Sequence, residues 1–194
     1  MECWQSLQQS PQNGDHERAQ LAYNLLSSLL PLAFKIFGDQ DDEVSSNIST
    51  FMSSYLMQLK AKQKSSTITE QEKQQVVGML QIIRNKGRYT EDFNFDPTKQ
   101  DEYEAGFLEY RRELMILFKN SVRLLPDLVK EFTKSSLLHA LTNQGSPFPD
   151  IEIGLSLFHQ IGEMFNEEVQ QGIGDKTYFE QLLAAVIEAS MHFC

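Results

Sequence analysis

The sequence has few cysteines and no long hydrophobic run. Its two cysteines, Cys3 and Cys194, stand at opposite ends of the 194 residues, which argues against a disulfide framework and favours a reducing compartment. The most apolar stretch, residues 29–37, contains a proline and a lysine and is too short to cross a bilayer. No apolar run follows a basic segment near residue 1, so no signal peptide is predicted. We therefore expect an intracellular protein with no membrane insertion.

Basic residues are also few compared with acidic residues. The chain has 17 Lys and Arg against 27 Asp and Glu, a formal net charge of −10. General nucleic-acid binders neutralise phosphates with clustered Lys and Arg, so the total charge argues against that class. It still allows a local basic strip, and it suits a partner whose docking surface is basic.

Motifs for catalysis, metals and cofactors are missing as well. The four histidines are scattered, and none has ligand spacing to a cysteine or carboxylate. Gly154 and Ser156 lack the second glycine of a hydrolase nucleophile elbow, because Phe158 stands in its place. Residues 174–177 resemble the end of a phosphate loop, but the lysine is displaced by one position, so a helix cap is the better interpretation. We predict no enzyme activity, no catalytic, cofactor-binding or metal-binding residues, and no small-molecule substrate.

What the sequence does have is helical periodicity. Apolar residues recur at steps of three and four, and no stretch alternates at period two for long enough to predict a sheet. Thr69 and Glu72 have the spacing of a capping box, and Pro126 suits the first position of a helix. Asp150 and Asp175 are predicted to cap helices of their own. The expected helices span residues 15–37, 41–64, 69–87, 103–125, 126–141, 150–169 and 175–194.

Alternate expected helices begin near residues 15, 69, 126 and 175, about 50 residues apart. Antiparallel helix pairs at nearly this period are typical of HEAT-type solenoids, whose repeats run roughly 40–47 residues. We therefore predict an all-α fold, an α-solenoid that forms a right-handed superhelical array. On this prediction residues 1–194 are a single block of about four repeats, cut inside helices at both ends, from a longer arch. A single irregular helical bundle is the rival interpretation.

Residues 89–106 form an acidic, aromatic connector between two expected helices. From Glu91 to Glu104 there are six carboxylates against one base, Lys99. The connector is too long for a minimal link and too aromatic for a disordered tether. Paired carboxylates can serve acid–base chemistry, but nothing nearby fixes their geometry. An insertion that enlarges one repeat is the better interpretation.

Basic residues gather on the helix that follows. Arg112, Lys119 and Arg123 are spaced by seven and four residues, which places them on one face. They form either a solvated face balanced by Glu109 and Glu113 or a short phosphate-contacting strip. A run of lysines at the end of the expected helix 41–64 allows the same two interpretations, and bases are also favoured at a helix carboxyl terminus. The RNA-contact candidates are Arg112, Lys119, Arg123, Lys60, Lys62 and Lys64.

Several runs of the chain resemble the central region of the exportin-T family of karyopherin-β proteins. The resemblance covers residues 15–170 and is strongest in 89–129. The runs that carry it are Asp41-Asp42-Glu43-Val44-Ser45-Ser46-Asn47-Ile48, Tyr55-Leu56, Leu59-Lys60, Tyr89-Thr90-Glu91-Asp92-Phe93-Asn94-Phe95, Phe107-Leu108-Glu109-Tyr110-Arg111-Arg112-Glu113-Leu114 and Pro126-Asp127-Leu128-Val129.

The resemblance implies an arch of HEAT repeats several times longer than this chain. Such a receptor binds tRNA cooperatively with Ran in its GTP form. It contacts nuclear pore proteins as it moves through the pore, and it shuttles between nucleus and cytoplasm. It is not an enzyme. In these arches the second helix of each repeat lines the inner surface, which would place 41–64, 103–125 and 150–169 on the inside.

The resemblance transfers no contact residues, so the site assignments rest on charge. The basic residues are predicted to meet the tRNA backbone. The acidic connector is predicted to meet a basic patch on Ran or to shield the inner cavity. The alternatives are a protein-binding HEAT-repeat scaffold and a different karyopherin with protein cargo. The GTPase-contact candidates are Asp96, Asp101, Glu102 and Glu104.

Overall fold

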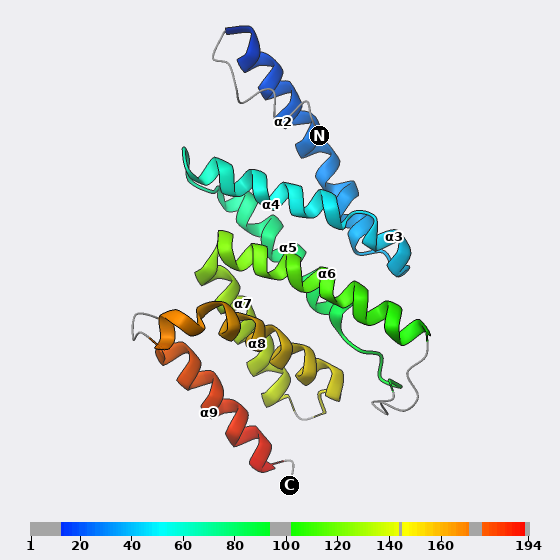
Figure 1. Cartoon of the computed structure of the whole chain (residues 1–194), viewed down its shortest axis with the longest axis vertical. Coiled ribbons are helices and arrows are strands. Elements are labelled where there is room, and N and C mark those ends of the chain that lie inside the picture. The colour runs from blue at the N-terminus through cyan, green and yellow to red at the C-terminus, as the bar shows by residue number, and fades with distance from the viewer. Residues whose placement is uncertain (1–12, 94–101, 144, 171–175, 193–194) are drawn as a thin grey trace. The chain divides into compact units, whose positions relative to one another are not determined.

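The computed structural model describes residues 13–93, 102–143, 145–170 and 176–192 (Figure 1). All regular structure in these ranges is α-helical, with no strand, which confirms the prediction of an all-α helical-repeat fold. Within the same ranges no helix is both long and apolar enough to cross a membrane. The contacts divide the chain into two compact units, residues 1–48 and 49–194.

The first unit contains α2 (Asn13–Phe37) and the short α3 (Asp42–Ser46). The Ser45 hydroxyl donates to the Phe37 carbonyl at 2.6 Å, and both residues are buried. Asp41 caps α3 by accepting hydrogen bonds from the backbone amides of Glu43 and Val44. These bonds fix the turn from α2 into α3.

The prediction of one continuous helix over 41–64 is wrong. α3 ends at Ser46, a turn follows at residues 47–48, and α4 (Ser49–Gln63) begins after it. The side chains of Ser46 and Asn47 both donate to the Glu43 carbonyl, at 3.1 and 2.7 Å. Short polar side chains that bond nearby backbone in this way compete with helix continuation.

The second unit consists of helices in two layers. α6 is central, because it contacts α4, α5, α7 and α8, and α7 also packs against α8 and α9. Figure 1 shows α4, α6 and α8 in one layer with α5 and α7 in the other. The second unit contains α4, α5 (Glu70–Gly87), α6 (Glu102–Leu124), α7 (Pro126–Thr142), α8 (Phe148–Gln170) and α9 (Lys176–His192).

The core of this unit is made of apolar side chains at helical spacing. Each buried side chain of this size contributes roughly 1.5–3 kcal/mol to folding. Because most of these residues recur every three, four or seven positions, each helix buries one stripe and leaves another in solvent. Fully buried members are Met52, Val76, Met79, Leu80, Ile83, Leu114, Phe118, Leu137, Ile153, Leu157 and Ile161.

Two of the predicted helix starts are confirmed and one is wrong. Thr69 and Glu72 form the expected capping box, and Pro126 stands at the start of α7. Asp150 is not the cap of α8, since the helix already begins at Phe148. Its carboxylate instead forms ion pairs with arginines of the preceding repeat. The predicted cap Asp175 lies outside the described residues, as do residues 1–12 and 193–194, where the chain was expected to be cut inside helices.

Candidate nucleic-acid interface

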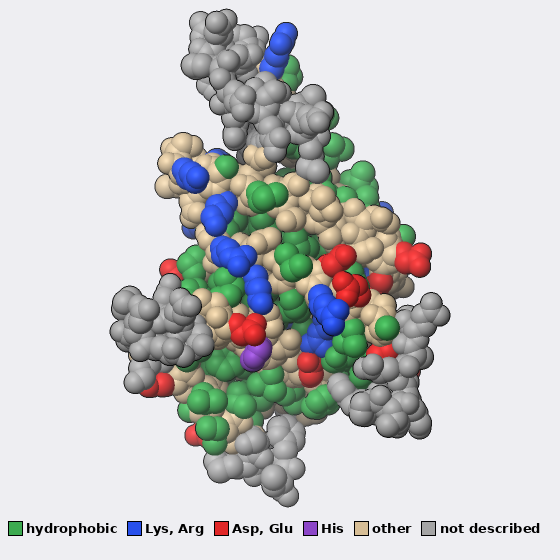
Figure 2. Space-filling view, in the orientation of Figure 1, with side chains coloured by type: hydrophobic (Ala, Val, Ile, Leu, Met, Phe, Trp, Pro, Cys, Tyr) green, Lys and Arg blue, Asp and Glu red, His purple; other side chains and the backbone are tan. Residues whose placement is uncertain are grey.

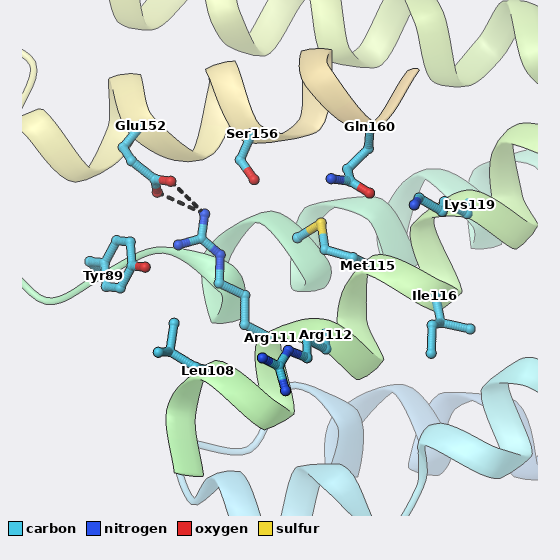
Figure 3. Close-up of a pocket in the computed structure, with 10 residues that line it drawn as sticks. All are labelled: Tyr89, Leu108, Arg111, Arg112, Met115, Ile116, Lys119, Glu152, Ser156 and Gln160. Atoms are coloured by element: carbon cyan, nitrogen blue, oxygen red, sulfur yellow. Dashed lines mark hydrogen bonds and ion pairs between the residues drawn. The ribbon is translucent and has the colours of Figure 1, made fainter. Parts of the chain in front are cut away.

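A groove with a volume of about 540 Å³ lies between α6 and α8 (Figure 3). Its α6 wall is a stripe at steps of three and four, and its α8 wall is a stripe at steps of four. Its volume lies within the usual range for ligand sites, 300–1,000 Å³. The lining residues are Leu108, Arg111, Arg112, Met115, Ile116 and Lys119 of α6, Glu152, Ser156 and Gln160 of α8, and Tyr89.

One end of the α6–α8 groove is closed by Arg111 and Glu152. A guanidinium nitrogen of Arg111 lies 2.7 and 2.8 Å from the two carboxylate oxygens of Glu152. The guanidinium also lies 4.5 Å from the centre of the Tyr89 ring. Arg111 is only 8% exposed, so this cation is part of the helix packing and is not available to a large ligand.

A second ion pair group lies beside it. Asp150 pairs with Arg84 at 3.3 Å and with Arg88 at 2.9 Å, which ties the end of α5 to the first turn of α8. The Tyr89 ring in turn contacts Phe93 and Phe107, with ring centres 4.1 and 5.3 Å apart. We call Arg84, Arg88, Arg111, Asp150 and Glu152 the corner cluster.

The sequence interpretation missed the corner cluster. Arg111 stands four residues after Phe107 and three before Leu114, so it belongs to the buried stripe of α6, whereas its neighbour Arg112 does not. That spacing was the available signal. The carboxylate partner of Arg111 comes from α8, 41 residues later, and Asp150 stands 66 residues after its partner Arg84. Local periodicity does not identify such distant pairs.

The other end of the groove is closed by Lys119 and Glu163. The Lys119 ammonium lies 3.2 Å from a Glu163 carboxylate oxygen, and the side chains are 31% and 50% exposed. Gln160 stands at the same end, and Figure 3 shows its amide near the Lys119 ammonium. This pair is a single contact at the surface, unlike the two contacts of Arg111.

Four of the predicted RNA-contact residues gather where α4 and α6 end. The Gln63 side chain donates to the Leu124 carbonyl at 3.3 Å, which brings the two carboxyl termini together. Figure 2 shows Lys and Arg side chains in a row over this region. Leaving Lys62 aside, we define the basic strip as the cations at these two helix ends that are at least partly exposed, Lys60, Lys64, Lys119 and Arg123.

The two other predicted RNA-contact residues are placed differently. Arg112 projects from the middle of α6, 75% exposed, and pairs with Glu109 at 2.7 Å. Lys62 turns toward α5 and pairs with the buried carboxylate of Glu72 at 2.7 Å. Lys62 therefore stabilises the α4–α5 pair, whereas Arg112 remains on the solvent side of α6.

Glu72 has the one resolved pKa shift among the described groups. Burial alone would raise the pKa of its carboxyl group. Hydrogen bonds from Lys62 and Thr69 and the charge of Lys62 outweigh burial and lower this pKa from its ordinary value of 4.5. The Glu72 carboxylate is thus held ionised by the helix start that it caps.

Of the predicted GTPase-contact residues, Asp96 and Asp101 lie outside the described part of the chain. Glu102 begins α6, and Glu104, two residues later, is half-buried. Within the described ranges no three His, Cys, Asp or Glu side chains are grouped to hold a metal ion.

Comparison with known proteins places the chain in a family. A family model described as Exportin-T matches residues 16–191. The human Exportin-T is 29% identical over 152 residues, which cover 78% of this chain and 15% of that protein. Exportin-T of mouse is 30% identical over 152 residues, and that of rice 27% over 182 residues, covering 90% of this chain and 17% of the rice protein. The chain thus spans less than a fifth of the length of these relatives, and it belongs to the exportin-T family.

Proposed function

We propose that the chain is a segment of a nuclear export receptor that binds tRNA cooperatively with Ran in its GTP form. The receptor carries tRNA from nucleus to cytoplasm through the nuclear pore, in contact with pore proteins, and shuttles between the two compartments. It is a transport protein without enzyme activity. The family match over residues 16–191 is the observation that carries this proposal.

The RNA-facing surface in this proposal is the basic strip together with Arg112. Its side chains come from α4, from the turn that follows it and from α6; the two helices are neighbours in one layer. These side chains face solvent or the rim of the groove. Lys and Arg in such a row contact phosphates without reading sequence. Lys62 contributes less to this surface because it holds Glu72.

The acidic residues Asp96, Asp101, Glu102 and Glu104 remain our prediction for the contact with Ran. Glu102 and Glu104 lie in the first turn of α6, and all four acidic residues carry the charge opposite to that of the basic strip. Complementary charge accelerates association and favours the correct partner.

A second candidate is a karyopherin-like scaffold with protein cargo. Two cations of the proposed surface, Arg112 and Lys119, already pair with carboxylates, and the net charge is −10. Both facts would suit a surface for protein better than one for RNA.

Pull-down of the whole protein by GTP-locked Ran, with and without tRNA, separates the two candidates. We expect Ran and tRNA to be captured together, each enhancing the other. In the same protein Arg112→Ala, Lys119→Ala and Arg123→Ala combined should flatten the salt dependence of tRNA binding, by about 0.9 in log–log slope for each lost duplex contact.

A control variant replaces two cations of α5 and α7 in the other layer, Lys73 and Lys134, with alanine, and its change in salt slope is compared for each charge removed. Capture of Ran without RNA would favour the protein-cargo receptor. A salt slope equal to that of the unsubstituted protein in the triple variant would remove the basic strip from the interface.

A further inference from the structure

The cations of the basic strip differ in what already contacts them. Among the described residues, no ion pair of Lys60 or Lys64 is found, and Arg123 donates to the neutral amide of Asn120 at 3.1 Å. Lys119 alone in the strip has a carboxylate partner from another helix, Glu163 of α8. The free protein therefore presents a row of cations with one carboxylate set into it.

The Lys119–Glu163 pair has the character of a replaceable contact. It consists of one contact at 3.2 Å between two long side chains, and Glu163 is half exposed. A lysine ammonium is a point charge that donates equally well to a carboxylate or a phosphate oxygen, whereas the arginine fork favours a planar partner in a fixed orientation. The Arg111–Glu152 pair has the opposite character, because one Arg111 nitrogen contacts both carboxylate oxygens and the guanidinium is buried against the Tyr89 ring.

We infer that Glu163 occupies the place of an RNA phosphate at Lys119, and that RNA binding exchanges the carboxylate for the phosphate. The inference rests on the proposed function, and it names Glu163 as a residue that weakens RNA binding at Lys119. Phosphate oxygens resemble carboxylate oxygens in charge and in accepting hydrogen bonds from Lys.

The exchange sets a threshold for binding. A ligand that meets Lys119 alone gains little, because it replaces one anion with another. A ligand that reaches Lys60, Lys64 and Arg123 at the same time gains contacts that displace no protein carboxylate. Glu163 is thereby a specificity-determining residue that disfavours short or isolated anions relative to an RNA backbone that follows the strip.

The test measures binding of labelled tRNA to the whole protein with Ran in its GTP form. Glu163→Gln should tighten binding several-fold at low salt, and the gain should shrink as salt screens the charge. The control is Glu131→Gln, which makes the same change in net charge at an exposed position of α7, a helix of the other layer. Equal affinities for Glu163→Gln and the unsubstituted protein would overturn the inference.

A double-mutant cycle separates exchange from general repulsion. If Glu163 competes for Lys119, the gain from Glu163→Gln should largely disappear in a Lys119→Ala background. The same gain in both backgrounds would show that Glu163 acts only by repelling RNA at a distance, and the exchange would be wrong.

The outcome also distinguishes this inference from the proposed function. If the triple alanine variant weakens tRNA binding but Glu163→Gln does not tighten it, the exchange fails and the interface stands. If neither substitution changes tRNA binding, the basic strip is not the RNA interface and the exchange fails with it, while the pull-down by Ran still decides the proposed function.

Discussion

The two ends of α8 are attached to the rest of the unit in different ways. At its amino-terminal end Asp150 and Glu152 meet three arginines, one of them buried, and Gly154 brings the helix close to α7. Toward its carboxyl-terminal end Glu163 meets one lysine at the surface, and Gly162 leaves ordinary space to α9. We therefore call the amino-terminal end of α8, which is fixed by buried contacts, the framework end. At the other end the carboxylate of Glu163 can be replaced by another anion.

This difference shows that ion pairs between the same two helices can have separate tasks. Removal of one partner from a buried pair leaves an uncompensated charge and costs several kcal/mol. An exposed pair contributes about 0–1 kcal/mol, since water and salt replace it readily. Exposure and the number of contacts, more than charge itself, separate the two ends.

The largest expected effect is at the framework end. Arg111→Ala should lower the free energy of unfolding by about 3 kcal/mol, because the Glu152 carboxylate loses both contacts while only 24% exposed. Urea unfolding followed by circular dichroism measures this change. Lys119→Ala is the matched variant at the other end, and its effect should stay within about 0.5 kcal/mol. Equal losses in the two variants would contradict the comparison.

A smaller effect should separate the two glycines of α8. A Cβ atom at Gly154 would lie 3.1 Å from Leu137 Cδ1 and 3.3 Å from Leu137 Cα, and the backbone atom does not move cheaply. Gly154→Ala should therefore destabilise the chain by about 1 kcal/mol, since overpacking outweighs the gain in helix propensity. At Gly162 the nearest contact would be Phe179 Cε1 at 3.8 Å.

Gly162→Ala should accordingly stabilise the chain by about 0.5–1 kcal/mol through helix propensity. Both variants are measured by the same urea unfolding. A stabilised Gly154→Ala protein would show that the framework end of α8 is less tightly packed than the structure indicates.

The smallest expected effect is a change in how stability falls at acidic pH. Glu72 resembles the framework pairs, because its carboxylate is buried against Lys62 and caps α5. Its pKa is lower in the folded chain than its ordinary value of 4.5, so its contribution to stability is present above pH 4.5. That contribution is lost as the pH falls below 4.5 and through the folded-state pKa.

Glu72→Gln should therefore show a shallower loss of stability than the unsubstituted chain as the pH falls below 4.5. Glu163→Gln, which removes an exposed carboxylate, serves as the comparison and should follow the unsubstituted chain closely. Unfolding by urea at several pH values measures the difference. Identical acid profiles for Glu72→Gln and the unsubstituted chain would contradict the assignment.

Much of the helical order could be predicted from local sequence. The capping box at Thr69, the proline at 126 and the stop at Gly87 are determined by neighbours within a few residues, so periodicity and capping rules identify them. The division of 41–64 was missed because Ser46 and Asn47 are tolerated in helices, and only their bonds to the Glu43 carbonyl reveal the turn.

The candidate site was only partly predictable for the same reason. The solvent face of α6 followed from the spacing of Arg112, Lys119 and Arg123. Which cation is held by which carboxylate depends on contacts between α6 and α8. Arg111 and Arg112 are adjacent and chemically identical, yet one is packed and the other solvated, because one step along a helix turns the side chain by about 100°.

The aromatic contacts of Tyr89 have a consequence for the Arg111–Glu152 pair. The Tyr89 ring packs on Phe107 and lies against the guanidinium of Arg111, which is the cation that holds Glu152. Through this one ring, the chain just after α5 contributes to the packing of α6 against α8.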